Sequence, residues 1–258
     1  MLERHLHDHI LQLRMARPPV NALDPTLVAM LRQAIEEAPA QGARGLLLAG
    51  SPGLFSAGLD IPVLLRLDRP AMAQFWRDFF GLCGALARSP IPAVAAIGGH
   101  SPAGGAVLGL FCDYRVMARG EFRIGLNEVQ VGLSVPEPIQ QALRRLVGTY
   151  RAERLLVAGS MLDPLEAHAV GLVDELAEAE HVETRARAWL EGVLALPTQA
   201  MTTTRAMARA DLAASFADLD ALPVESFLDV WFGAEAQSTL HALVARLKGT
   251  GDRGPGTG

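Results

Sequence analysis

The sequence changes its hydrophobic pattern near Pro197, and this change limits the folds that the chain can adopt. Before Pro197, short apolar stretches typical of buried strands alternate with longer stretches that have the three-to-four residue periodicity of amphipathic helices. After Pro197, only helical patterns remain. Alternating strands and helices predict an α/β architecture. We therefore predict an α/β core over residues 1–196, a helical region over 197–248 and a flexible tail over 249–258.

Apolar periodicity and capping residues predict the individual elements. Asp24 precedes Pro25, a combination that favours the start of a helix. The expected strands cover residues 11–15, 45–50, 92–97, 114–118, 121–124 and 171–175. The expected helices cover residues 25–35, 61–67, 71–88, 104–111, 138–147, 151–158, 164–168, 181–194, 198–210, 219–232 and 234–247.

Composition and charge exclude several classes of function. The 258-residue chain has a formal net charge of -5, so it shows no overall basic character for binding nucleic acid or anionic lipid. Its two cysteines match neither a disulfide framework nor a zinc site. The apolar stretch 91–111 has the length of a membrane span, but prolines and glycines interrupt it, so we expect no membrane role. The N-terminus lacks a signal-peptide pattern, and a cytoplasmic protein is expected.

Two glycine-containing loops carry the main functional information. Residues 55–60 (FSAGLD) and 102–106 (PAGGA) each follow an expected strand and precede an expected helix. Small residues let backbone N–H groups approach a ligand, and a helix start adds unpaired donors. Two such donors aimed at one point would hold a carbonyl oxygen that becomes an enolate. Spacing alone also permits ordinary tight turns or a phosphate cradle, although the GxGxxG and P-loop motifs are absent from the sequence.

Several further motifs occur together with these loops. Residues 125–133 (GLNEVQVGL) surround Glu128, and the segments 100–105 (HSPAGG) and 112–115 (CDYR) are also distinctive. Together with residues 151–174, these motifs resemble the crotonase superfamily, which is the enoyl-CoA hydratase/isomerase family. Within it, the sequence is most similar to the mitochondrial-type Δ3,Δ2-enoyl-CoA isomerases. The resemblance extends over about residues 14–195.

The resemblance implies a fold, a substrate and a set of site residues. The fold would be a crotonase-like α/β spiral of ββα repeats with an all-helical C-terminal trimerisation region, in a homotrimer or a dimer of trimers. The substrate would be an acyl-CoA thioester, so CoA is part of the substrate and no separate cofactor or metal is expected. By the same resemblance, the N–H groups of Leu59 and Gly104 would hold the thioester oxygen. The residues expected near CoA are Arg17, Ala57, Leu59, Ile61 and Lys248, of which Arg17 and Lys248 are candidates for the phosphates or are simply solvated charges.

The number of carboxylates distinguishes two reactions of this family. Enoyl-CoA hydratases use two glutamates, one to activate water and one to deliver a proton. By resemblance, the second glutamate position is Glu128, whereas the first is Val107, which cannot activate water. Moving a double bond from C3 to C2 requires a single carboxylate, and an apolar pocket would raise its pKa. We therefore predict a Δ3,Δ2-enoyl-CoA isomerase of fatty acid β-oxidation with Glu128 as the proton shuttle.

Three other residues bear on the choice of reaction. Pro136 stands where dienoyl-CoA isomerases place a catalytic aspartate, which argues against the dienoyl reaction. Glu137 stands where similar isomerases carry an apolar residue, so it is either a solvated residue at a helix start or a second acid that would permit hydration. We interpret His100 as a polar loop residue rather than an active-site neighbour. The alternatives to an isomerase are a hydratase that uses an acid such as Glu137 and a non-catalytic acyl-CoA-binding protein.

Overall fold

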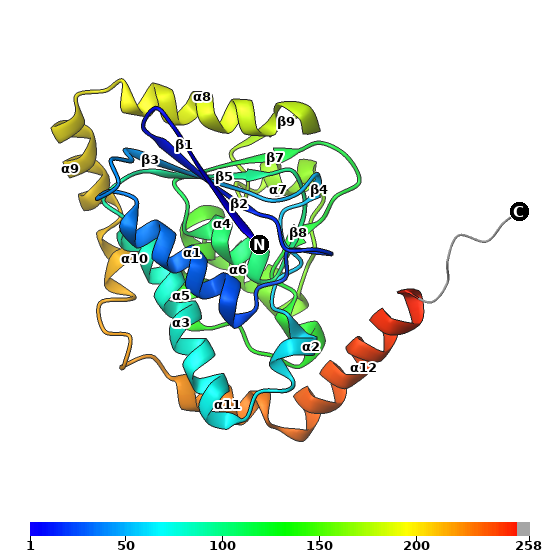
Figure 1. Ribbon diagram of the computed structural model, residues 1–258. Coiled ribbons are helices and arrows are strands. Elements are labelled where there is room, and N and C mark those ends of the chain that lie inside the picture. The colour runs from blue at the N-terminus through cyan, green and yellow to red at the C-terminus, as the bar shows by residue number, and fades with distance from the viewer. Residues whose placement is uncertain (252–258) are drawn as a thin grey trace, which may run out of the picture.

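Six strands form one sheet, and three short strands form a second sheet beside it (Figure 1). The computed structural model describes residues 1–251, with side chains described up to residue 247. The six-stranded sheet has the order β1-β2-β3-β5-β7-β9, in which the first pair is antiparallel and the other neighbours are parallel. The second sheet has the order β4-β6-β8 and is parallel. The strands are β1 (Leu2–His7), β2 (Ile10–Met15), β3 (Gly45–Ala49), β4 (Gly53–Leu54), β5 (Ala93–Ile97), β6 (Gly99–Pro102), β7 (Tyr114–Ala118), β8 (Ile124–Gly125) and β9 (Glu175–Ala177).

The chain repeats one order of elements, and this confirms the predicted α/β spiral of ββα units. A strand of the large sheet leads into a short strand of the small sheet and then into a helix, first through β3 and β4, next through β5 and β6, and again through β7 and β8. The helices that follow these pairs are α2 (Ile61–Leu64) with α3 (Arg69–Arg88), α4 (Gly104–Leu110), and α5 (Glu137–Val147) after the 3-10 turn η1 (Glu128–Val131). The other helical segments are α1 (Pro25–Glu37), α6 (Thr149–Ala158), α7 (Pro164–Ala169), η2 (Ala179–His181), α8 (Val182–Leu194), α9 (Thr198–Ala208), α10 (Ala210–Ala214), α11 (Val224–Trp231) and α12 (Ala234–Gly251).

Both faces of the large sheet are covered by helices. Helix α8 lies along one face, and α1, α3 and α4 lie on the other (Figure 1). Strand β3 shows the consequence, because Leu46 and Leu48 belong to the main core while Leu47 and Ala49 pack in the smaller cluster under α8. Strands buried on both faces are continuous apolar runs. This explains why the central strands were predictable from their composition.

Strand β1 was not expected from the sequence. Most of its residues are charged or histidine, and all but Leu2 are exposed. It is an edge strand that pairs antiparallel with β2, in the register Leu2 to Met15 through His7 to Ile10. Charged edge strands protect a sheet against further pairing, and they lack the apolar pattern that predicts a strand.

Two expected strands lie elsewhere in the structure. The prediction for 171–175 is wrong, because the N–H groups of Leu172 and Val173 bind the Ala167 carbonyl at 2.9 and 3.2 Å and close helix α7. Gly171 permits this closure with a φ of 82°. Strand β9 therefore starts only at Glu175, and the strand expected at 121–124 is reduced to β8.

The helical C-terminal part is more broken than expected. Arg209 interrupts the predicted helix 198–210, and α11 begins at Val224 because the Asp218 side chain accepts two backbone N–H groups in the preceding turn. Helix α12 runs to Gly251, three residues into the segment predicted as a flexible tail, whose remainder lies outside the described residues. Among residues 1–251, no helix has the length and apolar character needed to cross a membrane.

Candidate active site

One cavity of about 450 Å³ brings together almost all residues that the sequence singled out. It lies where both glycine-containing loops meet the turn of Glu128. The predicted residues in its wall are Arg17, Ala57, Leu59, Ile61, Gly104, Val107 and Glu128. The side chain of Lys248 lies outside the described residues, so its assignment to a CoA phosphate stays a prediction.

The first loop places Leu59 in the wall of this cavity. Leu59 forms a parallel bridge with Leu23, in which the Leu23 N–H donates to the Gly58 carbonyl at 2.8 Å and the Asp60 N–H donates to the Leu23 carbonyl at 3.0 Å. These two bonds use the carbonyl of Gly58 and the N–H of Asp60, and neither uses the N–H of Leu59. Within the described residues, the Leu59 N–H therefore has no protein acceptor and can serve a ligand.

The second loop contributes the N–H of Gly104 at the first turn of α4. The first N–H groups of a helix have no intrahelical acceptor, and no protein group in residues 1–251 accepts from the Gly104 N–H. The preceding Ala103 has φ 46° and ψ -120°, a strained conformation for a non-glycine residue and one that clusters at functional sites. The two loops pack tightly: a Cβ at Gly58 would lie 3.2 Å from the Gly104 nitrogen.

Glu128 opens the short 3-10 turn η1, which follows β8. The turn ends at Gly132, whose φ of 75° suits glycine, and the Leu133 N–H donates to the Glu128 carbonyl at 3.1 Å. Gly132 packs closely on α12, since a Cβ there would lie 3.1 Å from the Ala236 Cα. Backbone bonds and helix packing thus hold the residue that carries the carboxylate.

The Glu128 carboxyl is in an apolar environment that favours its neutral form. Its Oε2 atom is buried and has no hydrogen-bond partner among the described residues. Burial raises the pKa of Glu128 to about 7, and a hydrogen bond from its own backbone N–H offsets only part of that effect. A carboxyl group with a pKa near neutrality can both accept and return a proton, which is the property required of a general base that later acts as an acid.

Apolar side chains from distant parts of the chain complete the wall of the cavity. Trp76 and Phe79 come from α3, and Leu243 and Leu247 come from α12. Nothing in the sequence pattern indicates that the α12 leucines line a cavity. Their periodicity is that of an ordinary amphipathic helix, which does not distinguish a cavity wall from a core.

Comparison with known proteins identifies the group to which this chain is related. Residues 6–245 match the family described as "Enoyl-CoA hydratase/isomerase". The chain belongs to the enoyl-CoA hydratase/isomerase family. The match also covers the C-terminal helices beyond residue 195, where the motif resemblance ended.

Both sequence and structural relatives fall in this family. The chain is 32% identical to the mitochondrial enoyl-CoA delta isomerase 1 of Mus musculus over 239 residues, which is 92% of this chain and 83% of the relative. It is 36% identical to a putative enoyl-CoA hydratase of Thermus thermophilus over 177 residues, covering 67% of this chain and 69% of the relative. The crystal structure of human mitochondrial delta3-delta2-enoyl-CoA isomerase matches with a TM-score of 0.92 at 30% identity, over 96% of this chain and 98% of the human one.

Arg17 lines the cavity, but its guanidinium contacts two carboxylates of the protein. Its Nη2 atom lies 2.7 Å from Asp60 and 3.2 Å from Asp24. Its Nη1 atom donates to the Ala22 carbonyl at 3.2 Å. Groups of the protein thus hold the guanidinium, and the expected contact with a CoA phosphate stays a prediction.

Glu137 and His100 lie away from the cavity wall. Glu137 begins α5 with an exposed side chain that forms an ion pair with Arg144, as expected for a solvated residue at a helix start. His100 is exposed on β6, where its Nδ1 accepts the Arg123 N–H at 3.1 Å. Neither is among the residues that line the cavity. A hydratase mechanism that uses Glu137 has no support in this geometry.

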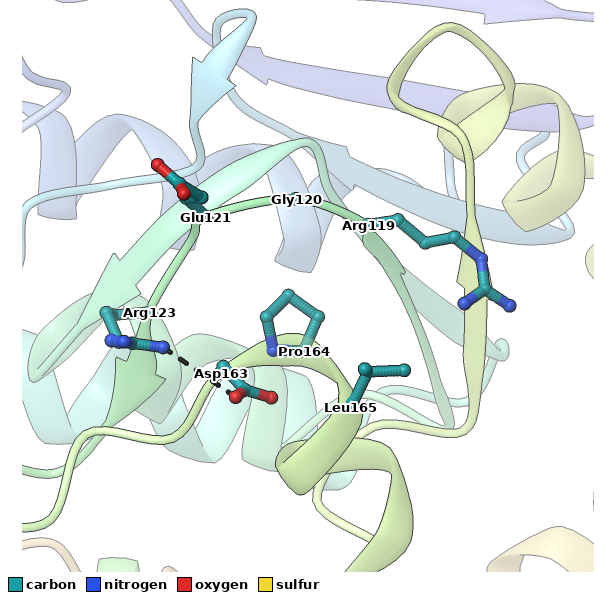
Figure 2. A pocket seen from close by; sticks show the side chains of 7 residues that line it. All are labelled: Arg119, Gly120, Glu121, Arg123, Asp163, Pro164 and Leu165. Atoms are coloured by element: carbon teal, nitrogen blue, oxygen red, sulfur yellow. Dashed lines mark ion pairs between the residues drawn. The ribbon is translucent and has the colours of Figure 1, made fainter.

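A second hollow, of about 710 Å³, is larger but lacks comparable chemistry. It lies between the loop after β7 and the start of α7, and Figure 2 shows Arg123 beside Asp163 with Arg119 on the other side. Arg123 pairs with Asp163 at 4.0 Å, and Arg119 pairs with Glu178 at 3.7 Å. These are exposed ion pairs, which contribute little energy and present no buried reactive group. The smaller, mostly apolar cavity is the better candidate.

The environment of Glu128 can be tested through protein stability, independently of catalysis. Because the folded-state pKa of about 7 exceeds the unfolded value, the folded protein binds more protons between those values, and its stability falls as pH rises toward and through 7. Glu128→Gln removes the buried charge. The difference in unfolding free energy, variant minus wild type, should therefore rise by about 3 kcal/mol from pH 5 to pH 8.

Urea unfolding at the two pH values measures this difference. Glu137→Gln is the matched control, because the Glu137 side chain is exposed and paired with Arg144. The control should show no comparable gain. A difference between Glu128→Gln and wild type that stays constant from pH 5 to pH 8 would contradict the buried, proton-binding state of this carboxyl.

Proposed function

We propose that this chain is a Δ3,Δ2-enoyl-CoA isomerase that uses Glu128 as a single acid–base group. The observation that carries the proposal is the set of acidic groups in the cavity. Two carboxylates line it among the described residues, Asp60 and Glu128, and Asp60 is engaged by Arg17 and by the start of α2. Val107, which takes the place of the other hydratase glutamate, is buried and apolar. The wall thus offers one carboxyl for proton transfer.

The proposed reaction is a proton transfer across an allylic system. The Glu128 carboxylate takes a proton from C2 of a 3-enoyl-CoA, and the electron pair of that C–H bond forms a dienolate. Negative charge develops on the thioester oxygen, where the N–H groups of Leu59 and Gly104 donate hydrogen bonds. The Glu128 carboxyl then returns the proton to C4, and the double bond stands between C2 and C3. The step is redox-neutral, so it requires no cofactor beyond the CoA of the substrate.

The acyl-CoA would enter between the two loops, with CoA near Ala57, Leu59 and Ile61. We also propose the predicted homotrimer or dimer of trimers. Helix α9 has no buried residue in the single chain, and Met207 on it is 75% exposed, which supports a partner surface there. The cytoplasmic location and the role in β-oxidation stay predictions.

The proposal is tested with purified protein and a medium-chain trans-3-enoyl-CoA, followed by chromatography with mass detection. The expected product is an isobaric 2-enoyl-CoA, formed without any added cofactor. A product heavier by one water, formed directly from added 2-enoyl-CoA, would instead establish a hydratase. Another group would then activate the water in place of the glutamate that is missing at Val107. If the protein binds the CoA ester but forms no product from the 3-enoyl-CoA or the 2-enoyl-CoA, it is an acyl-CoA-binding protein and not an isomerase.

A further inference from the structure

Arg17 connects the starts of two helices that flank the candidate site. Asp24 is the N-cap of α1 and accepts the Leu27 N–H at 2.8 Å, while Asp60 is the N-cap of α2 and accepts the Val63 N–H at 3.1 Å. In each carboxylate, Oδ1 caps its helix and Oδ2 contacts the Arg17 guanidinium. Both aspartates are only 9% exposed. A half-buried arginine thus fixes two capping carboxylates at once.

This cluster is directly attached to the first oxyanion donor. Asp60 is the residue after Leu59, and its N–H donates to the Leu23 carbonyl on the other strand of the Leu23–Leu59 bridge. The segment before Asp24 is tied to the same loop, since the Ser56 hydroxyl donates to the Asn21 carbonyl at 2.7 Å. The direction of the Leu59 N–H therefore depends on how the two aspartates are held relative to each other.

The charges of the cluster do not suit a phosphate ligand. One guanidinium is shared by two carboxylates, so Arg17, Asp24 and Asp60 together carry a net negative charge when the acids are ionised. A phosphate group placed there would meet like charge at close range, which is unfavourable in a partly buried site. The guanidinium already donates to a carbonyl and to both carboxylates.

We propose that Arg17 is a positioning residue, which orients the Leu59 N–H through Asp60 and Asp24 and does not bind the phosphates of CoA. Its effect on turnover rests on the proposed isomerase function. Arg17 acts on the backbone donor and touches no reacting atom. Its removal should therefore lower kcat for any thioester, regardless of whether the substrate carries phosphates.

The kinetic test compares Arg17→Met and Arg17→Lys on two substrates, a 3-enoyl-CoA and the matching pantetheine thioester, which lacks the nucleotide phosphates. Arg17→Met should lower kcat about 10²-fold with both substrates, the loss expected for a misplaced catalytic donor. The ratio of the two KM values should stay unchanged, and Arg17→Lys should restore part of kcat. A KM increase confined to the CoA ester would overturn the proposal and establish a phosphate ligand.

Amide hydrogen exchange provides a measurement that needs no turnover. Exchange in residues 56–61 should accelerate in Arg17→Met and in Asp60→Asn, and it should slow again in Arg17→Lys. Unchanged exchange in all three variants would overturn the positioning role. Because this measurement is independent of the reaction, it decides the role of Arg17 even if the isomerase assay fails.

Arg69 offers a matched control within the same chain. Its Nη2 atom also lies between two carboxylates, Glu225 at 3.0 Å and Asp229 at 2.6 Å, but its side chain is 45% exposed and lies outside the cavity wall. Arg69→Met should leave kcat and the exchange of residues 56–61 at wild-type values. An equal loss in Arg69→Met and Arg17→Met would assign the effect to general destabilisation and overturn the proposal.

Discussion

Replacing Glu128 with glutamine is expected to lower kcat for isomerisation by about 10²–10⁴-fold, the usual contribution of a general acid–base group. Glutamine keeps the size and shape of the side chain but cannot take a proton from C2. The affinity for the acyl-CoA should change little, because the apolar wall and the N–H groups of Leu59 and Gly104 are untouched. Steady-state kinetics with a 3-enoyl-CoA, together with calorimetric binding of a saturated acyl-CoA, separates the two quantities.

Glu137→Gln serves as the comparison for this experiment. Its carboxylate is exposed at the start of α5 and is paired with Arg144. Its loss should therefore leave kcat within about twofold of wild type. The opposite pattern, with Glu137→Gln inactive and Glu128→Gln active, would refute the single-carboxylate mechanism and return the hydratase alternative to consideration.

Replacing Gly58 with alanine is expected to lower kcat by about 10²–10³-fold, as when one oxyanion donor is lost. The added Cβ would lie 3.1 Å from the Ala103 Cβ and from the Pro102 carbonyl oxygen, and 3.2 Å from the Gly104 nitrogen. The backbone there also has a φ of 85°, which alanine adopts poorly. The two loops must separate, and both donors then move away from a shared oxygen.

Gly42→Ala isolates the effect of backbone strain. Gly42 has almost the same φ, 87°, but no atom lies within 4 Å of its added Cβ. Both variants should lose a similar amount of thermal stability from strain, while only Gly58→Ala should lose turnover. Equal kcat values for the two variants would show that the close packing of the loops is unimportant for the reaction.

The sequence was most informative where function depends on backbone conformation. The glycines of both loops stand out because few other residues can occupy a tight strand-to-helix turn, and Glu128 stands out within a distinctive motif. These residues do line one cavity. The central strands were also predictable, because burial on both faces gives a continuous apolar run such as 45–49.

The sequence was least informative where a contact joins distant segments. The pairing of Arg17 with Asp60 spans 43 positions, and nothing in the local pattern distinguishes it from a solvated charge. Local periodicity failed for a related reason at Leu172 and Val173, which are apolar because their side chains are buried in the main core and not because they form a strand. Strand β1 was missed because its stability comes from pairing with β2 and not from apolar side chains of its own.

Helix α12 has a consequence for when the enzyme can first act during its synthesis. The helix supplies Leu243 and Leu247 to the cavity wall and packs against Gly132, which ends the turn of Glu128. It leaves the ribosome after every strand of both sheets. A nascent chain that has already assembled its sheets would therefore still have an open, hydrated pocket and a loosely held carboxylate. Under the proposed function, turnover should therefore begin only after α12 has packed against the turn of Glu128.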